Sequence, residues 1–366
     1  MTSNSSSKAA QAVLIMAGGT GGHIFPGLAV AEALENNGTP VRWLGARGAM
    51  ECERVPPRAI PLDTVDISGL RGKGALGWVK APFRLMRAVL QASSVIGHHR
   101  PRCAISFGGY AAGPGGLAAW LRGVPLLVHE QNRVPGLTNK VLARMARKVL
   151  QAFPGTWPSS EKAETCGNPV RREVVALAEP QARFVGRQGR PRLLITGGSQ
   201  GARALNTNVP GALALLPVGE RPLVRHQAGR REAEHTAQAY RAQGIEAEVG
   251  EFIDDMAEAY AWADLVVCRS GALTVSELAA AGLGAVLVPF PHAVDDHQTR
   301  NAEFLAEAGA AEILPETELT PESLADVLRR LLGDRAGRLR MAQAARSVAV
   351  PDSAQRVAGL CLEVAG

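Results

Sequence analysis

The sequence predicts an α/β protein of two similarly built domains, each organised around its own parallel sheet. Short apolar segments alternate with longer segments of helical periodicity, which is the pattern of β–α–β units. Two apolar segments, 13–17 and 193–196, run directly into glycine-rich turns that are each followed by a helical pattern. The length of 366 residues also allows about two domains at roughly 150 residues each.

The first half contains predicted strands at 13–17, 41–44, 103–107 and 126–128. The first strand leads into the glycine turn 18–22, and the helix after this turn ends near Gly38. The strand at 126–128 leads into His129-Glu130-Gln131-Asn132. All these strands are short and apolar, as expected for a buried parallel sheet.

The second half repeats this organisation, with predicted strands at 193–196 and 264–268. Its glycine turn at 197–201 lies about half a chain length after the first one, as expected for two domains of similar size. We expect the boundary near Gly167-Asn168-Pro169, which gives an N-terminal domain of 1–168 and a C-terminal domain of 169–350. The final segment, 351–366, is a predicted helix of the kind that can cross back to the N-terminal domain.

Composition and charge argue against several classes of protein. With 46% hydrophobic residues, the chain has enough apolar surface to fold as globular domains. Its net charge of +6 comes from 40 basic and 34 acidic residues, an excess too small to indicate nucleic-acid binding. The five cysteines are scattered without a C-x-x-C pair, which argues against a disulfide framework or a structural zinc site and favours a reducing cytoplasm.

Neither a targeting segment nor a membrane-spanning segment is predicted. Residues 1–12 are rich in Ser and Ala and lack the apolar centre of a signal peptide. The apolar segment 278–294 is interrupted by glycines and prolines, so it is not expected to form one spanning helix. We therefore expect a protein that is neither exported nor embedded in a membrane.

The two glycine turns are candidate anion sites. After a strand, such a turn lets backbone N–H groups approach an anion at the positive end of a helix. Neither turn fits the dinucleotide fingerprint G-x-G-x-x-G, and the sequence has no Walker A motif, which argues against NAD and ATP. His23 ends the first turn and is a candidate general base, while Ser199 and Gln200 are neutral donors for phosphate oxygens. The alternative is a pair of tight turns with ordinary capping contacts and no ligand.

Three polar residues of the second half are further candidates. Arg171 supplies a cation near the expected domain boundary, although a lone Arg is more often simply solvated. Glu277, one turn into a predicted helix, is able to accept both hydroxyls of a ribose, but the local sequence favours a capping box with Thr274. Gln298 is a candidate sugar contact. It follows His and Asp residues at 292–297 that match no common metal-ligand spacing, so a metal site is not expected.

Residues 71–90 form a basic amphipathic segment with apolar residues at helical spacing. Two interpretations are open. The residues alone favour a surface helix that buries its apolar face against the sheet, and the alternative is a helix that lies on an anionic membrane. The apolar residues are Leu76, Val79, Phe83, Met86 and Leu90, and the basic residues are Arg71, Lys73, Lys80, Arg84 and Arg87.

Six segments together resemble the MurG family of N-acetylglucosaminyltransferases. The segments are 18–29, 68–74, 129–132, 167–171, 197–202 and 268–277. The resemblance runs in order from about Val13 to about Val357, and several of the segments are long and unbroken. It implies a GT-B fold, in which two Rossmann-like domains with parallel sheets face each other across a cleft.

The resemblance also implies a reaction and its substrates. Members of the family transfer N-acetylglucosamine from UDP-GlcNAc to undecaprenyl-pyrophosphoryl-MurNAc-pentapeptide (lipid I), which gives lipid II for peptidoglycan synthesis. The C-terminal domain would bind UDP-GlcNAc and the N-terminal domain the lipid acceptor, at the cytoplasmic face of the inner membrane. The muramoyl 4-hydroxyl would attack the anomeric carbon with inversion through an oxocarbenium-like transition state, with no cofactor and no metal ligand set.

Roles for individual positions follow from the same resemblance. His23 is the first candidate for the general base, and Glu130 is the second, either as a base or as a group that orients the site. Glu277 is assigned to the ribose, which reverses the local preference for a capping box. The stretch 291–297 departs in length and composition from the enterobacterial form. The other assigned contacts are Thr20, Gly21 and Gly22 for the donor's sugar and phosphates, Asn132 for a sugar, Arg171 and Ser199 for nucleotide or phosphate, Ile253 for uracil, Ala272, Leu273, Thr274, Val275 and Ser276 for the diphosphate, and Gln298 for the GlcNAc hydroxyls.

A lipid acceptor also favours membrane docking by the basic amphipathic segment. The residues assigned to this surface are Val79, Phe83, Met86 and the separate Trp120, with Lys80, Arg84 and Arg87 facing anionic headgroups. Other functions remain alternatives: a UDP-GlcNAc epimerase or a different GT-B glycosyltransferase, a nicotinamide-dependent oxidoreductase, or a non-catalytic scaffold of the cell-wall machinery.

Overall fold

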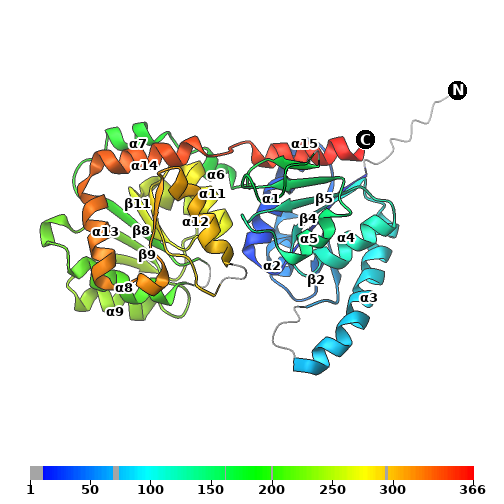
Figure 1. Ribbon diagram of the computed structural model, residues 1–366, viewed down its shortest axis with the longest axis horizontal. Helices are drawn as coiled ribbons and strands as arrows, with labels where there is room; N and C mark the ends of the chain where they lie inside the picture. The colour runs from blue at the N-terminus through cyan, green and yellow to red at the C-terminus, as the bar shows by residue number, and fades with distance from the viewer. Residues whose placement is uncertain (1–10, 69–73, 161, 199–200, 293–295) are drawn as a thin grey trace. The chain divides into compact units, whose positions relative to one another are not determined.

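The computed structural model describes residues 11–68, 74–160, 162–198, 201–292 and 296–366, with only the backbone described at 74–80 (Figure 1). The chain forms two compact units. The first runs to Pro169 and also includes Asp352–Gly366, and the second is Val170–Pro351. Each unit has its own parallel sheet.

The first unit is built on a seven-stranded sheet in the order β3-β2-β1-β4-β5-β6-β7. In its centre, Val13 of β1 lies opposite both Val41 of β2 and Cys103 of β4. The strand order reverses between β1 and β4, and open parallel sheets bind ligands at such a switch point. The strands are β1 Val13–Ala17, β2 Val41–Ala46, β3 Leu62–Val65, β4 Cys103–Gly108, β5 Leu126–Glu130, β6 Lys148–Gln151 and β7 Ala163–Thr165.

Helices cover both faces of this sheet. Because side chains alternate along a strand, Val13 and Ile15 of β1 enter a core with α1 and α15, while Leu14 and Met16 enter a second core with α3 and α4. The helices are α1 Gly21–Asn36, α2 Glu51–Arg54, α3 Gly74–His99, α4 Ala112–Leu121, α5 Leu137–Ala143 and α15 Ser353–Ala365, with the 3₁₀ turn η1 Pro56–Arg58.

The C-terminal helix α15 is part of the first unit. Its Val357 and Cys361 are fully buried in the core that contains α1. The Cys103 thiol donates to the backbone carbonyl of Cys361 at 3.2 Å, and the Ser353 hydroxyl donates to the carbonyl of Asn168 at 2.6 Å. The last helix of the chain therefore completes one face of the first sheet.

The second unit is built on a six-stranded sheet in the order β10-β9-β8-β11-β12-β13, which reverses between β8 and β11. The strands are β8 Arg192–Thr196, β9 Leu223–Gln227, β10 Ala247–Gly250, β11 Leu265–Cys268, β12 Ala285–Leu287 and β13 Ala311–Ile313. The helices are α6 Arg172–Val175, α7 Pro180–Val185, α8 Arg203–Ala214, α9 Ala233–Ala242, α10 Met256–Trp262, α11 Ala272–Ala281, α12 His297–Glu307, α13 Pro321–Gly333 and α14 Arg335–Ser347, with the 3₁₀ turns η2 Val218–Glu220 and η4 Glu316–Glu318.

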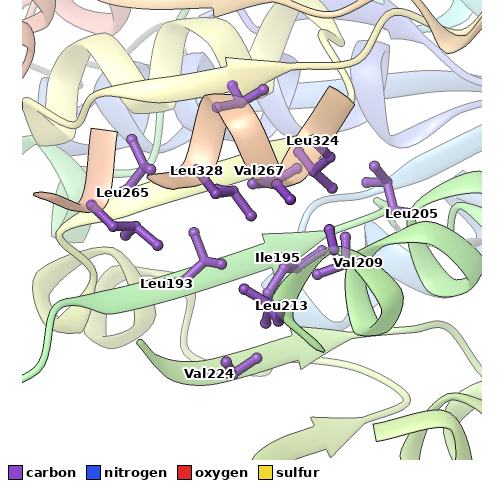
Figure 2. Packing of buried hydrophobic residues seen from close by; sticks show 14 of the residues in the cluster. Leu193, Ile195, Leu205, Val209, Leu213, Val224, Leu265, Val267, Leu324 and Leu328 are labelled. Carbon is purple, nitrogen blue, oxygen red and sulfur yellow. The ribbon is translucent and has the colours of Figure 1, made fainter. Parts of the chain in front are cut away.

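One face of the second sheet is buried under α8 and α13 (Figure 2). Ile195 of β8 and Val267 of β11 are fully buried there, together with Val209 of α8 and Leu328 of α13. The helix α13 begins with a reciprocal capping box, in which the Thr320 hydroxyl accepts the N–H of Ser323 and the Ser323 hydroxyl accepts the N–H of Thr320. In both α8 and α13 the buried apolar residues recur every three or four positions, and this spacing determines which side of each helix faces the sheet.

The predicted pair of parallel α/β units is confirmed. The expected strand 13–17 coincides with β1, and the final segment predicted as a helix, 351–366, contains α15. The other expected strands differ from the observed ones by one or two residues. The remaining strands of both sheets were not predicted. Strands such as β7 and β10 are only three and four residues long and are partly exposed, so they lack the continuous apolar pattern of the central strands.

The helix α3 does not bury its apolar stripe against the sheet, so that interpretation is wrong for the described side chains. Phe83, Met86 and Leu90 are 79%, 62% and 64% exposed. The face that α3 buries is formed by Ala88, Val89, Ala92 and Ile96. The side chains of Leu76, Val79 and Lys80 lie outside the described part of the chain. Among the described residues, no helix combines the length and apolarity needed to cross a membrane.

His226 on β9 is buried in a complete hydrogen-bond network. Its Nε2 donates to Asn206 Oδ1 at 3.1 Å, and its Nδ1 accepts from the Tyr240 hydroxyl at 2.9 Å. Burial lowers the pKa of His226 to about 3. The folded chain therefore keeps this imidazole neutral at a pH where an exposed imidazole binds a proton.

We expect the stability of the second unit to fall as the pH drops below about 6.5, because the unfolded chain then binds a proton that folded His226 does not. The contribution of neutral His226 to the free energy of unfolding is fully present above the pKa of a histidine in the unfolded chain. Below that pKa it is lost at up to about 1.4 kcal/mol per pH unit. Urea unfolding at several pH values tests this: His226→Gln should flatten the slope, and the exposed His235→Gln should not. Equal slopes for wild type and His226→Gln would contradict the assignment.

Candidate active site

The polar and glycine-rich segments of both units follow the carboxyl ends of parallel strands. In open parallel sheets, ligands bind in the crevice outside these ends. The segments are 18–23 after β1, 109–111 after β4 and 131–136 after β5 in the first unit, and 197–202 after β8, 251–255 after β10 and 269–271 after β11 in the second.

The turn after β1 is held by a buried carboxylate. Glu51, the first residue of α2, is fully buried, and its Oε2 accepts the N–H of Gly19 at 3.0 Å. Its Oε1 accepts the N–H of Ala46 at 2.7 Å. Gly19 has a φ of +84°, and a Cβ at position 18 would overlap the Glu51 carboxylate, so both positions require glycine.

His23 lies in the first turn of α1, where this glycine turn positions its ring. Its Nδ1 is 3.2 Å from the carbonyl oxygen of Gly18 and 3.3 Å from the Thr20 hydroxyl. A Cβ at Gly108, the last residue of β4, would lie 3.2 Å from His23 Nε2. The imidazole therefore sits at the switch point between β1 and β4. Gly21 and Gly22 form the start of the same helix.

Glu130, the last residue of β5, braces the segment that follows it. The side chain is 2% exposed, and its Oε1 accepts from the backbone N–H of Asn132 at 3.0 Å and from Asn132 Nδ2 at 3.2 Å. Its Oε2 accepts from the N–H of Gly136 at 3.0 Å and from Asn139 Nδ2 at 2.9 Å. Four donors engage this carboxylate, a geometry that suits a group that orients Asn132 better than a base.

The neighbouring His129 has a structural role. Its Nε2 donates to the carbonyl of Gly167 at 2.9 Å, and its Nδ1 accepts from Gln131 Nε2 at 3.1 Å. Burial lowers the pKa of His129 to about 4, although the hydrogen bond to Gly167 acts in the opposite direction. This neutral imidazole links the end of β5 to Gly167, two residues before the chain leaves the first unit at Pro169.

In the second unit, Glu277 of α11 is the centre of a buried polar cluster. Its Oε1 accepts from Arg171 Nε at 2.9 Å and from Arg171 Nη2 at 2.8 Å, and its Oε2 accepts from the Tyr260 hydroxyl at 3.1 Å. Burial and the Glu277 charge raise the pKa of Tyr260 well above its ordinary value, so the hydroxyl remains a donor. Burial alone would lower the pKa of Arg171, but the carboxylate more than offsets this and the pKa is raised.

The capping box that the local sequence favours for Glu277 does not form. The N-cap of α11 is Gly271, so Thr274 lies in the first turn and Glu277 lies six residues beyond the cap, too deep in the helix to reach its orphan N–H groups. The carboxylate instead binds Arg171 and Tyr260. Arg171 comes from a segment 106 residues earlier in the chain, a contact that local spacing does not encode.

The N-terminus of α11 has the character of an anion site. The first turn contains no acidic residue, and the ten-residue helix directs its first N–H groups and the positive end of its dipole outward. Ala272 and Val275 are buried, and the Ser276 hydroxyl donates to the carbonyl of Ala272 at 2.9 Å. Leu273 and Thr274 are half-buried in the same turn.

The other predicted contacts of the second unit lie on nearby segments. Ile253 is half-buried between β10 and α10. Gln298 is in the first turn of α12, where its Oε1 accepts the N–H of Phe290 at 3.0 Å, and the buried Asn301 donates to the carbonyl of Ser270 at 3.3 Å. The predicted phosphate contact Ser199, with its neighbour Gln200, lies outside the described residues.

Two buried residues of these clusters were missed by sequence reasoning. Glu51 belongs to a four-residue helix, and its contact with Gly19 spans 32 residues. Tyr260 is a buried aromatic residue of the seven-residue helix α10, and a buried aromatic by itself indicates only core packing. Neither has a local motif, so only the folded chain shows that they bind Gly19 and Glu277.

Two family models match the chain. The glycosyltransferase family 28 N-terminal domain matches residues 13–151, and the glycosyltransferase family 28 C-terminal domain matches residues 192–357. The chain belongs to glycosyltransferase family 28. Its family 28 domains contain His23, Glu51 and Glu130 in the first match and Glu277 in the second, whereas Arg171 lies between the two.

Individual relatives agree with this family assignment. The chain is 54% identical to a protein of Marinobacter nauticus, over 96% of this chain and 97% of the relative, and 58% identical to one of Xanthomonas campestris pv. campestris (strain 8004), over 97% and 82%. Both are named UDP-N-acetylglucosamine–N-acetylmuramyl-(pentapeptide) pyrophosphoryl-undecaprenol N-acetylglucosamine transferase. The crystal structure of Acinetobacter baumannii MurG matches with a TM-score of 0.85 at 42% identity, covering 96% of this chain and 99% of that one.

Proposed function

We propose that this family 28 glycosyltransferase transfers N-acetylglucosamine from UDP-GlcNAc to the muramoyl 4-hydroxyl of lipid I and forms lipid II with inversion. The observation that carries the proposal is that the buried Glu277 lies in the helix α11, whose N-terminal turn contains no acidic residue. A nucleoside diphosphate has ribose hydroxyls that suit the carboxylate and a charged diphosphate that suits the helix N-terminus. The names of relatives that are 54% and 58% identical to this chain over 96% and 97% of its length supply the acceptor.

In this proposal the second unit, about 169–350, binds the donor. Glu277 accepts the ribose hydroxyls, and the diphosphate lies against the start of α11 at Ala272, Leu273, Thr274, Val275 and Ser276. Arg171 is both a partner of Glu277 and a cation near the phosphates. The backbone of Ile253 reads the uracil, Gln298 contacts the GlcNAc hydroxyls, and Ser199 contacts the phosphates.

The first unit, about 1–168 together with the C-terminal helix, binds the acceptor. His23 is the general base, and Asn132 contacts a sugar from an orientation that Glu130 fixes. The turn with Thr20, Gly21 and Gly22 faces the transferred sugar and the phosphates. A base positioned in this way contributes roughly 10²–10⁴-fold to the rate.

The chemistry is a single displacement. The muramoyl 4-oxygen forms a bond to the anomeric carbon while its proton passes to His23, and the bond from the anomeric carbon to the β-phosphate oxygen breaks with its electron pair going to UDP. The leaving diphosphate gains negative charge, which a helix N-terminus stabilises by up to about 2 kcal/mol in a buried geometry. Arg171 adds a positive charge to the same end.

The acceptor lipid requires docking at a membrane, which we assign to the exposed surface of α3. Phe83 and Met86 are 79% and 62% exposed, and Trp120 on the adjacent α4 is 51% exposed. Arg84 and Arg87 flank the apolar residues, and we extend the surface to Val79 and Lys80. The enzyme would thus act as a peripheral protein at the cytoplasmic face of the inner membrane.

Mass spectrometry of a reaction with UDP-GlcNAc, a short-chain lipid I analogue and EDTA tests the proposed activity. We expect a product heavier by one N-acetylhexosamine, because the described chemistry assigns no step to a metal. A free epimerised sugar without acceptor modification would instead support the epimerase alternative. Binding of UDP-GlcNAc with neither product would contradict the transferase assignment.

Glu277→Gln should weaken UDP binding by about 10-fold or more, because hydrogen bonds from ribose hydroxyls to a charged carboxylate contribute about 1.5–3 kcal/mol. Calorimetric titration with UDP and with 2′,3′-dideoxy-UDP makes the test specific. The loss should disappear for the dideoxy ligand, which lacks the hydroxyls. The exposed Glu246→Gln on the same unit is the control. An equal loss for both ligands would contradict a ribose contact.

Reversing the charges of Arg84 and Arg87 to Glu should reduce cosedimentation with phosphatidylglycerol vesicles. Each basic residue near an anionic surface contributes about 1 kcal/mol, so the partition coefficient should fall at least about 30-fold. Reversing the exposed Arg54 and Arg58 of the same unit is the matched control. Unchanged sedimentation of the first variant would count against this surface.

A further inference from the structure

We propose that Glu51 is a positioning residue for the general base and acts on His23 through the Gly18–Gly19 peptide group. The inference rests on the proposed role of His23 in the transfer reaction. Glu51 does not touch the imidazole itself. It binds one end of a peptide group whose other end binds the imidazole.

The two contacts belong to a single planar amide. Its N–H, from Gly19, donates to Glu51 Oε2 at 3.0 Å, and its carbonyl oxygen, from Gly18, lies 3.2 Å from His23 Nδ1. Because the amide is delocalised, a negative charge at the N–H end increases the electron density on the carbonyl oxygen. The carboxylate thereby strengthens the acceptor that faces the imidazole.

The surroundings fix the carboxylate in this position. Glu51 is fully buried, and its second oxygen accepts the N–H of Ala46 at 2.7 Å. A Cβ at Gly18 would overlap the carboxylate, and one at Gly45 would lie 2.5 Å from Glu51 Cγ. The two glycines thus leave room for this side chain and no more. The carboxylate is held against the peptide, and the peptide is held against His23.

This arrangement selects one tautomer of His23. A carbonyl oxygen only accepts hydrogen bonds, so the contact with Gly18 requires the proton to be on Nδ1. The Thr20 hydroxyl, 3.3 Å from the same nitrogen, also has lone pairs to accept that proton. The lone pair that takes a proton from the substrate hydroxyl is then on Nε2. When Nε2 is protonated, the polarised carbonyl stabilises the imidazolium.

The logic is that of a Ser-His-Asp triad, in which a buried carboxylate holds the imidazole in its working tautomer. Here a peptide group stands between carboxylate and imidazole. A purely structural Glu51, which only joins α2 to the turn, would not select the tautomer of His23. The positioning role and the purely structural role of Glu51 therefore predict different tautomers of His23, and an NMR spectrum reports the tautomer directly.

The first test is ¹⁵N NMR of the full chain with ¹⁵N-labelled histidine, at a pH above the ordinary imidazole pKa of about 6.5. The spectrum of His23→Gln identifies the signals of His23 among the eight histidines. We expect wild-type His23 to be protonated on Nδ1, and Glu51→Gln to shift it toward a mixture of tautomers. The exposed Glu53→Gln in the same short helix should leave it unchanged.

A wild-type His23 that is protonated on Nε2 would overturn the inference, and this measurement does not depend on whether Glu51→Gln folds. It is also independent of catalysis. A wrong tautomer therefore refutes the positioning role alone and leaves the proposed transferase function standing.

The second test is kinetic, with UDP-GlcNAc and the lipid I analogue. Glu51→Gln should lower kcat by about 10-fold or more, within the roughly 10²–10⁴-fold of a positioned base. It should change the Kd for UDP little, because the proposed contacts with uracil, ribose and the start of α11 all belong to the second unit. His23→Gln with Glu51→Gln should lose no more activity than His23→Gln alone. Losses that multiply in the double variant would show that Glu51 acts independently of His23 and would overturn the inference. Full activity of His23→Gln would refute the base assignment, and the inference with it.

Discussion

The parallel alignment of the strands is the constraint on which the rest of this structure depends. Because every strand of a sheet runs in the same direction, all segments that leave the carboxyl ends gather at one edge. The central strands β1 and β8 place their glycine turns beside the point where the strand order reverses. This brings His23, which follows β1, against Gly108, which ends β4, although 85 residues separate them along the chain. The strands thus fix where each loop begins, and the loops contain the polar residues that are proposed to meet the substrates.

Buried carboxylates hold these loops in place. Glu51 and Glu130 are 0% and 2% exposed, and they accept the backbone N–H groups of Gly19 after β1 and of Asn132 after β5. Glu277 is 8% exposed and instead joins Arg171 to Tyr260 of α10. Burying a charge without partners is costly, so Glu51 and Glu130 are stable only while their loops keep the bound conformation. The same contacts that satisfy the carboxylates therefore preorganise the backbone and side chains proposed to meet the substrates.

The sequence was informative where physical patterns are local. Apolar runs predicted the central strands, and the glycine turns predicted where helices begin next to them. Long-range pairs were not predictable in this way: the Arg171–Glu277 contact and the Glu51–Gly19 contact join segments that no periodicity relates. The capping-box interpretation of Glu277 failed because the N-cap of the helix is Gly271, which only the folded chain reveals. The resemblance to a family supplied the substrates, which residue chemistry alone left open.

Hydrogen–deuterium exchange with and without UDP tests the central claim most directly, namely that the nucleotide binds the second unit at the Glu277 cluster and the start of α11. The account predicts that UDP slows exchange most in peptides that cover 251–256 and 271–277, with little change in 131–136. Protection confined to the first unit, or bound UDP that leaves 271–277 unprotected, would contradict it.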